Sequence, residues 1–319
     1  MTELGPGKEF DTIRRIAAAL GAAATELGDD CAFLSVGGEQ LALSTDSCVE
    51  RVHFRREWLT LQEVGWRATA AALSDLAAVG AGAPRVLAAL TVPDRSEAEP
   101  LMTGVGAAAV SVGGVVIGGN VTHGRELSLT ITVVGTVKQP VRRSGARPGD
   151  GLWVTGLLGL PRAALQTWLH GGIPAEPARR KFSHPEPRIA AGQWLAAQGA
   201  SAMLDLSDGL AGDAGHIAAA SRCRLEIDLG HLPIAPEVRA AAAASGQAAE
   251  PFAAAGGEDY ELLVTLPAAF NSAEECLRKT GVPLTRIGSC LASGPAAPPG
   301  VILLTHGQPV ELRGFDHFA

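Results

Sequence analysis

Apolar positions recur at helical spacing in some segments and alternate with polar positions in others, and the two kinds of segment follow one another along the chain. In the first half this pattern predicts helices near 8–20, 60–80 and 96–110 and strands near 31–36, 40–45, 85–92, 114–118 and 126–137. The second half begins with a predicted strand, GLWVTG, followed by helix, helix, strand, helix and strand. This alternation is typical of the α/β and α+β classes.

A segment rich in Pro, Gly and Arg, KQPVRRSGARPGD, separates the two halves. Such composition marks linkers, because it favours turns over regular structure. We therefore predict an N-terminal domain over 1–138, a linker over 139–150 and a C-terminal domain over 151–319. A chain of 319 residues is long enough for two domains, each with its own core.

Composition narrows the possible partners. The formal net charge of −7 argues against nonspecific binding to nucleic acid or to acidic membranes. No apolar run is long enough to span a bilayer, and the N-terminus does not resemble a signal peptide. The five cysteines form no CxxC pair, which argues against a disulfide framework or a zinc site. Together these features predict a cytoplasmic protein with no nucleic-acid or membrane partner.

Five short stretches place carboxylates beside Gly, Ser or Thr: GDDCA, LSTDSCVE, LSDLAAVGAGAP, LDLSDGL and GGEDYE. Magnesium prefers hard oxygen ligands and keeps several waters, so carboxylates flanked by hydroxyls suit it. The alternative is that each stretch is a helix cap or a turn, since Asp, Ser and Gly favour those positions.

Asp75 favours the metal interpretation. In the predicted helix 60–80, an apolar stripe includes Ala68, Ala72 and Leu76, and Asp75 falls within it. A carboxylate on a buried stripe costs several kcal/mol unless it is paired or bound to a metal ion. The alternative is a helix that breaks before Ser74, with Asp75 as a cap.

The stretch LDLSDGL points the same way. In a strand, Asp205 and Ser207 share one face, opposite Leu204 and Leu206. Asp208 then falls where a helix begins, with free amide groups that suit a phosphate. Because Asp208 would repel a bare phosphate, a cation between them is needed.

Familiar nucleotide motifs do not occur. No Walker A pattern surrounds any lysine, there is no protein-kinase catalytic loop, and GVGAAAV lacks the third glycine of a dinucleotide fingerprint. A nucleotide site in this chain would rest on metal ions and arginine.

With these stretches identified, the chain resembles the thiamine-monophosphate kinase family, a branch of the aminoimidazole-ribonucleotide-synthetase-like proteins. The matching pieces run in family order from residue 28 to residue 318: GDDCA, STDSCVERVHF, LSDLAAVGA, RSGARPGD, LDLSDGL, GGEDYELL and GFDHF. The resemblance implies an N-terminal α/β domain that dimerises, a C-terminal α/β domain and an active site between them. It implies magnesium-dependent transfer of the γ-phosphoryl group of ATP to thiamine monophosphate.

The resemblance also implies roles for individual residues. The expected metal ligands are Asp30, Ser44, Thr45, Asp46, Asp75, Asp205 and Asp208, with Asn120 at a further metal position. The expected nucleotide contacts are Gly119, Asn120, Arg143 and Ser207. The expected thiamine-phosphate contacts are His53, Glu258 and Phe315.

One residue departs from the family pattern. Asn120 in GGNVT stands where the family usually has Asp, and an amide offers a metal an oxygen without the charge. From the residues alone, three other assignments stay open: His53 as a packed loop residue, Arg143 as a solvated linker residue, and Phe315 as a core anchor.

The chemistry needs no general base. A phosphate monoester has its second ionisation near pH 6 and is therefore largely dianionic at neutral pH. Cations that offset the repulsion between this dianion and ATP allow direct in-line transfer. Two alternatives remain: a catalytically weakened nucleotide- or thiamine-phosphate-binding protein, suggested by Asn120, and another ATP-using enzyme of the same fold, such as a selenophosphate synthetase.

Overall fold

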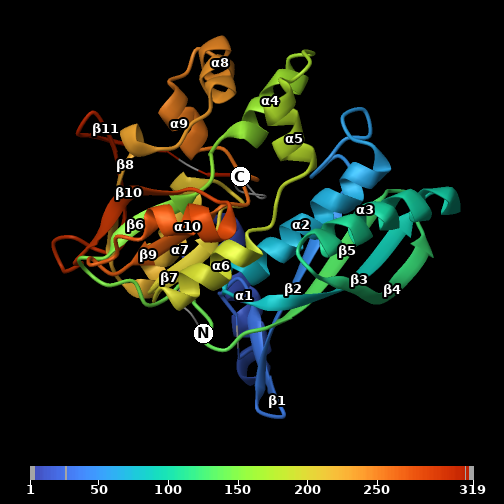
Figure 1. Cartoon of the computed structure of the whole chain (residues 1–319), viewed down its shortest axis with the longest axis horizontal. Coiled ribbons are helices and arrows are strands. Elements are labelled where there is room, and N and C mark those ends of the chain that lie inside the picture. The colour runs from blue at the N-terminus through green and yellow to red at the C-terminus, as the bar shows by residue number, and fades with distance from the viewer. Residues whose placement is uncertain (1–3, 26, 313, 316–319) are drawn as a thin grey trace.

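The computed structural model describes residues 4–25, 27–312 and 314–315, and it places two sheets side by side with helices packed on them (Figure 1). The first half of the chain contributes the helices α1 (Lys8–Leu20), α2 (Leu61–Ala78) and α3 (Ala98–Ser111). Its strands are β1 (Ala32–Val36), β2 (Glu39–Val49), β3 (Gly82–Val92), β4 (Val115–His123) and β5 (Ser128–Thr136).

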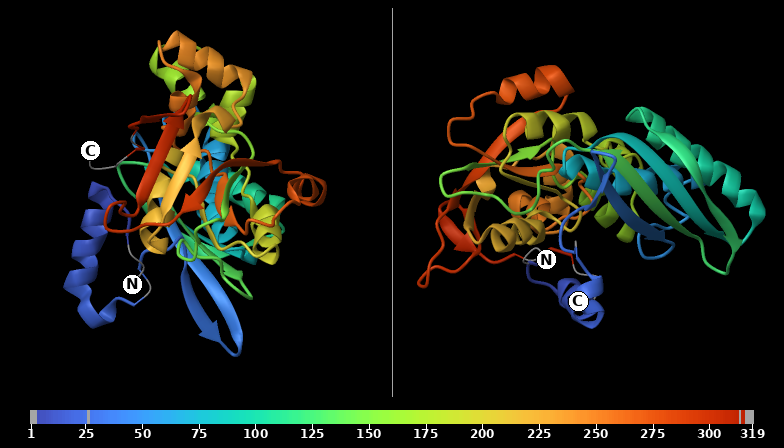
Figure 2. Two further views of the ribbon diagram at one scale, coloured as in Figure 1. Left: turned by 90° about the vertical axis from the view of Figure 1, so that its left-hand side faces the viewer. Right: turned by 90° about the horizontal axis from the view of Figure 1, so that it is seen from below.

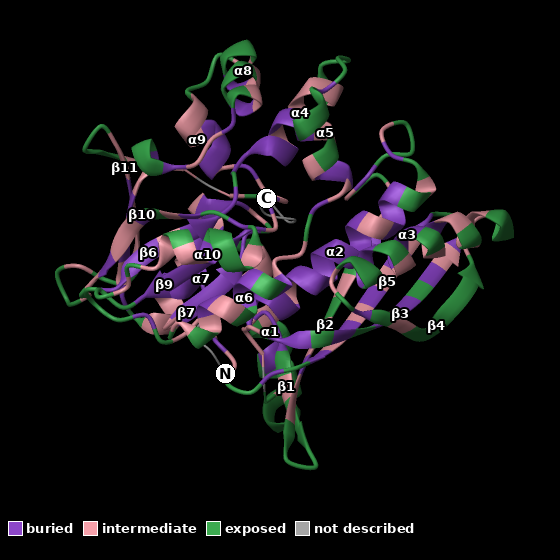
Figure 3. Cartoon of the chain, viewed as in Figure 1, coloured by how far each residue is buried: buried purple, intermediate pink, exposed green. Residues whose placement is uncertain are grey.

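These strands form a five-stranded sheet with the order β1-β2-β5-β3-β4. Strands β3 and β4 are parallel and the other neighbouring pairs are antiparallel. Along β5, every second residue is buried, as expected for a sheet with one face on the core. Helix α2 packs against β5 and β2, and α3 packs against α2 (Figure 3). Strand β4 is the edge of the sheet and is almost wholly exposed.

Helix α2 holds the two halves of the molecule together. It begins with a capping box in which the Thr60 hydroxyl accepts from the Glu63 N–H and the Glu63 carboxylate accepts from the Thr60 N–H. It approaches α3 closely, since a Cβ on Gly65 would lie 2.0 Å from the Leu101 carbonyl oxygen. On another side α2 contacts β7 and α6 of the second half. Its residues therefore face both halves.

The second half contributes the helices α4 (Leu160–Leu169), α5 (Glu176–Ser183), α6 (Ile189–Ala197), α7 (Leu210–Ser221), α8 (Pro236–Ala244), α9 (Ala249–Ala254) and α10 (Ala273–Thr280). Its strands are β6 (Gly151–Thr155), β7 (Ala202–Asp205), β8 (Arg224–Asp228), β9 (Leu262–Leu266), β10 (Leu284–Leu291), β11 (Gly300–Thr305) and β12 (Gln308–Val310).

These strands form a seven-stranded mixed sheet with the order β12-β11-β8-β10-β6-β9-β7. Strands β7 and β9 are buried along their whole length. Helix α7 packs on β7, β8 and β11, whereas α4, α5, α8 and α9 project beyond the sheet (Figure 2). Within the described residues, no helix combines the length and the apolar character needed to cross a bilayer.

The predicted mixture of helices and sheets in two α/β halves is confirmed. Strands β2 and β4 end later than the pattern predicts, because backbone pairing continues past the apolar residues. Strand β2 runs on through Asp46, which pairs with Ile131, to Val49, which pairs with Ser128. Strand β4 likewise continues beside β3 to His123. The extra length of β2 includes Asp46 and places it on the sheet beside Ile131 of β5.

Candidate active site

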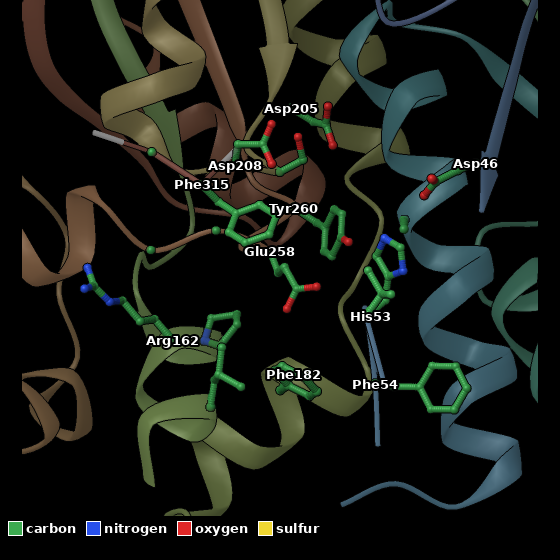
Figure 4. A pocket seen from close by; sticks show the side chains of 18 of the residues that line it. Asp46, His53, Phe54, Arg162, Phe182, Asp205, Asp208, Glu258, Tyr260 and Phe315 are labelled. Atoms are coloured by element: carbon green, nitrogen blue, oxygen red, sulfur yellow. The ribbon is translucent and has the colours of Figure 1, made fainter. Parts of the chain in front are cut away.

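A cavity of about 590 Å³ opens between the two halves (Figure 4). Its lining comes from the end of β2, the loop after it, and α2 on one side. On the other side it comes from α4, α5, the turn before α7, the loop before β9 and the chain near Phe315. Most of the residues singled out from the sequence line it: Thr45, Asp46, His53, Asp75, Asp205, Ser207, Asp208, Glu258 and Phe315.

Three carboxylates gather beside this cavity. Asp30 precedes β1, Asp75 lies in the last turn of α2, and Asp205 ends β7. One carboxylate oxygen of each lies within 4.8 Å of the others. Helix α2 continues unbroken through Asp75 to Ala78, so the alternative in which the helix breaks before Ser74 is wrong.

The acidic cluster is strained electrostatically. Burial, reinforced by Asp205 and Asp30, raises the pKa of Asp75 well above its usual range. Burial and the nearby Asp30 raise the pKa of Asp205 to about 7. Burial and Asp30 also raise the pKa of the adjacent Asp29 to about 6. Ionised carboxylates at this spacing repel one another, and a cation among them would relieve that repulsion.

The donor set fits a hard divalent cation. Asp30 Oδ1 accepts from the Arg143 guanidinium at 2.7 Å. Asp30 Oδ2 is buried and accepts no hydrogen bond from the described residues. A buried carboxylate oxygen without a partner is costly, and carboxylate oxygens are the ligands that magnesium prefers. Arg143 is thus bound to the acidic cluster and does not simply solvate the linker; its expected nucleotide contact stays a prediction.

Strand β2 divides its polar residues between two faces. Ser44 donates to Asp75 Oδ2 at 2.5 Å, and Asp46 lines the cavity. The Thr45 hydroxyl lies instead 2.9 Å from the hydroxyl of Thr132 on β5. Because side chains alternate along a strand, the structure does not bring the Thr45 hydroxyl into the acidic cluster.

The turn between β7 and α7 differs in one respect from the expectation. Asp205 is buried and Ser207 is exposed, and both line the cavity, as does Asp208. The amide groups at the start of α7 are not all free, since Asp213 accepts from the N–H groups of Asp208 at 3.1 Å and Gly209 at 3.0 Å. A phosphate at this helix start would meet amides that are already partly occupied.

Gly119 and Asn120 do not join the site within one chain. Both lie on β4, are exposed, and are absent from the cavity lining. Strands β5 and β3 separate β4 from β2, and three strand spacings amount to roughly 14 Å. The sequence gives no sign of this separation, because it depends on the order of strands in the sheet.

His53 and Phe315 both face the cavity (Figure 4). His53 Nδ1 accepts from the Val49 N–H at 3.0 Å, so the neutral ring carries its proton on Nε2. Phe315 is 58% exposed and its N–H donates to the Asp208 carbonyl at 2.9 Å. A side chain this exposed is not part of the core, so the alternative of Phe315 as a core anchor is wrong. The residues 316–318 of the closing motif lie outside the described residues.

The three acids of GGEDYE have different surroundings. Glu258 lines the cavity and forms an ion pair with Arg67 of α2. Asp259 is buried and accepts from the Gly159 N–H at 2.9 Å. Glu261 is fully buried and accepts from Lys181 at 2.5 Å and from Arg188 at 2.6 Å. Burial with two cations makes Glu261 part of the core of the second half.

Sequence reasoning missed several residues that line or support the cavity. The lining includes Arg55, Trp58, Arg162, Phe182 and Tyr260, and Arg67 supports it from behind. Arg67 carried a detectable signal, since the sequence places this charged residue in the same mostly apolar helix as Asp75. The others come from segments whose meeting depends on the tertiary fold.

Comparisons with known proteins agree with this architecture. The AIR synthase related protein N-terminal domain matches residues 28–137, and the corresponding C-terminal domain matches residues 147–296. The thiamine-monophosphate kinase of Escherichia coli K12 is 37% identical over 326 residues, covering 97% of this chain and 96% of that protein. The Mycobacterium tuberculosis H37Rv enzyme is 35% identical and covers 80% of this chain and 79% of its own length.

Solved structures give the same result. AaThiL complexed with AMPPCP and TMP superposes with a TM-score of 0.85 at 31% identity, covering 98% of this chain and 97% of the other. Thiamine-monophosphate kinase from Stenotrophomonas maltophilia K279a gives a TM-score of 0.77 at 36% identity, covering 95% and 98%. The hydrogenase maturation protein HypE shares the fold at 21% identity. The family resemblance seen in the sequence is confirmed, and this chain belongs to the thiamine-monophosphate kinases of the AIR synthase related family.

Proposed function

We propose that this chain transfers the γ-phosphoryl group of ATP to thiamine monophosphate and thereby forms thiamine diphosphate. The observation that carries the proposal is the convergence of Asp30, Asp75 and Asp205, from both halves of the chain, beside one cavity. The cavity, about 590 Å³, has the size of a small-molecule site. AaThiL, which shares this fold, was solved with an ATP analogue and TMP.

Magnesium is the proposed cofactor, with several ions. Asp30, Asp75 and Asp205 would hold one ion, and Asp46 and Asp208, which face the same cavity, would share in holding others. When bound, these ions offset the negative charge of the two phosphate groups and orient them. Ser44 orients Asp75 through its hydrogen bond, and Arg143 orients Asp30.

The reacting groups need alignment and no proton transfer. The acceptor phosphate is largely dianionic at neutral pH, so it attacks without a general base. The residues on this side of the cavity therefore bind and orient: Asp46, Asp205 and Asp208 define the acidic end. Transfer is direct and in line, with no covalent enzyme intermediate.

The part of the cavity lined by aromatic side chains would bind the thiamine rings. Phe315 offers an exposed aromatic face, and His53 offers an Nε2–H donor. Glu258 offers a carboxylate, and Phe182 and Trp58 contribute aromatic walls. An aromatic site with a few placed polar groups is typical of small-molecule recognition.

A homodimer is the proposed assembly. The exposed edge strand β4 carries Val115, Ile117 and Val121, which are 46%, 56% and 57% exposed. An apolar edge strand is a ready surface for pairing with another chain. A second copy seated there would cover these residues and would also bring Gly119 and Asn120 out of solvent. The nucleotide and metal contacts expected of Gly119 and Asn120 therefore depend on the formation of this dimer.

One assay tests the function. Purified protein is incubated with ATP, magnesium and thiamine monophosphate, and thiamine diphosphate is measured. Formation of the product supports the kinase. Binding of both ligands without product would instead support the binding-protein alternative that Asn120 suggests, and selenide-dependent ATP consumption would support a selenophosphate synthetase.

A further inference from the structure

Arg67 is a buried cation whose guanidinium group has three described contacts. It is 2% exposed on α2, and its Nη1 donates to the Phe182 carbonyl oxygen at 2.6 Å. The guanidinium also stacks on the Phe182 ring at 3.9 Å from its centroid. Its Nη2 forms an ion pair with Glu258. A buried arginine is tolerated only when it is paired, and Glu258 is its ion-pair partner among the described residues.

Glu258 is held in an uncommon conformation at the wall of the cavity. Its φ is 67°, in the left-handed region that non-glycine residues rarely occupy. Its N–H donates to the Ser207 carbonyl at 2.6 Å, which ties it to the turn that carries Asp208. The Glu258 side chain is 26% exposed and points into the cavity (Figure 4). Strain at such a position persists only where the surroundings enforce it.

The ion pair determines what kind of ligand group Glu258 can receive. An arginine side chain carries only N–H donors, so the Glu258 oxygen that faces Arg67 acts as an acceptor. One oxygen, Oε1, faces Arg67, and the second is left for the cavity. A ligand atom that meets Glu258 must therefore be an N–H or O–H donor. Thiamine monophosphate has one such group, the exocyclic amine of its aminopyrimidine ring.

Helix α2 carries both Arg67, which pairs with Glu258, and Asp75 of the acidic cluster. Arg67 and Asp75 are eight residues apart on one unbroken helix, which corresponds to about 12 Å along its axis. A rigid helix therefore supports both the acidic end and the Glu258 wall of the cavity. A molecule with a phosphate at one end and an amine-bearing ring at the other fits this arrangement.

We propose that Arg67 is a positioning residue that holds the Glu258 carboxylate in place as a hydrogen-bond acceptor for the amino group of the substrate's ring. The proposal rests on the proposed thiamine monophosphate kinase function. Arg67 itself does not line the cavity, so it acts through Glu258. The competing explanation is that Arg67 only ties α2 to α5 through the Phe182 carbonyl.

A double-mutant cycle separates these explanations. The variants are Arg67→Met, Glu258→Gln and the two combined, and KM for thiamine monophosphate, KM for ATP, kcat and thermal midpoint are measured for each. We expect Arg67→Met to raise KM for thiamine monophosphate at least about tenfold, with KM for ATP changed less than about twofold. In the Glu258→Gln background, Arg67→Met should add little.

The chain offers a matched control. Arg179 of α5 forms an ion pair with Glu63 of α2 at 2.8 Å, and neither residue lines the cavity. Arg179→Met thus breaks a link between the same two helices, and it should leave both KM values unchanged. If Arg67→Met proves unstable, Arg67→Lys and the combined variant carry the test, since the first keeps the charge and the second leaves no unpaired charge.

Several outcomes would overturn the inference. Equal effects of Arg67→Met with and without Glu258→Gln would show that Arg67 acts independently of Glu258. An unchanged KM for thiamine monophosphate in folded Arg67→Met would also overturn it. If the wild-type protein forms no thiamine diphosphate, the proposed function fails. Calorimetric binding of thiamine monophosphate to wild type and Arg67→Met then still tests Arg67.

Discussion

Ser44 on β2 donates a 2.5 Å hydrogen bond to the carboxylate of Asp75 on α2. This bond links β2 to the helix α2 that packs on it, in the helical turn that contains Asp75. A hydroxyl in this place fixes the carboxylate orientation while leaving its other oxygen for a cation.

Removing this hydroxyl should weaken metal binding. We expect Ser44→Ala to raise the magnesium concentration needed for half-maximal activity about 10- to 100-fold, with recovery of kcat at saturating magnesium. The control is Ser47→Ala, on the opposite face of β2, where the hydroxyl lies 3.1 Å from that of Thr130. Equal magnesium dependence in both variants would argue against the orienting role.

Asp46 and Asp208 should matter for turnover far more than for folding. Both face the cavity from opposite halves of the chain. Asp46→Asn and Asp208→Asn remove charge where phosphate-bound cations would be held, so we expect kcat to fall at least about a hundredfold. The thermal midpoint should change little. Asp11→Asn, an exposed substitution on α1, serves as the control, and full turnover of either test variant at limiting magnesium contradicts the ligand assignment.

Removal of metal should make stability depend on pH in a particular direction. The pKa of Asp205 is raised from 3.8 to about 7 by burial and Asp30. A raised carboxyl pKa means that the folded state binds protons that the unfolded state has released. Stability in chelator is therefore highest below about pH 4 for this group and falls as pH rises towards about 7. Saturating magnesium should flatten this dependence in thermal melts; a fall of equal size with magnesium would count against the cation site.

His216 should impose the opposite dependence. It is buried against Phe10, with ring centroids 4.0 Å apart, and burial with nearby Arg143 lowers its pKa from 6.5 to about 3. The unfolded chain binds a proton that the folded state excludes, so stability is lost as pH falls from about 6.5 towards 3, at about 1.4 kcal/mol per unit. His216→Phe keeps a ring beside Phe10 and should reduce this loss in denaturant titrations. If the free energy of unfolding of His216→Phe falls between pH 6.5 and 3 as much as that of the wild type, groups other than His216 cause the fall.

A charge on the β4 edge should disrupt the proposed dimer. Val121 is 57% exposed on this strand, and Val121→Glu places a charge on the apolar edge. We expect light scattering to show a monomer. We also expect reduced activity, because Gly119 and Asn120 are then no longer next to a second copy of the chain. Leu277→Glu, at a 51% exposed position on α10, should alter neither property. A wild-type protein that is monomeric at assay concentration would refute the dimer directly.

Local patterns predicted much of this fold and part of its site. The apolar stripe of α2 placed Asp75 on a buried face, and the strand ending at Asp205 placed a second acid at a strand terminus. Both inferences use periodicity within one element, which the sequence contains in full. The lengths of β2 and β4 were underestimated, since their ends depend on partner strands.

Other features depend on long-range packing and left weak signals. That the Thr45 hydroxyl would pair with Thr132 requires the neighbour of β2 to be known. The distance of Gly119 from the cavity requires the strand order. That Glu258 rather than Glu261 faces the cavity depends on Lys181 and Arg188, which approach from another helix and another loop.

The distribution of Asp30, Asp75 and Asp205 over both halves restricts how this protein can be recombined. A chimera that exchanges one half for that of a relative keeps two intact sheets. In such a chimera, however, α2 and β7 come from different parents. Their packing against each other, which brings Asp75 close to Asp205, is then changed. A hybrid therefore keeps the acidic cluster only if both α2 and β7 come from the same parent. We expect active hybrids to be those whose crossover points leave these two elements together.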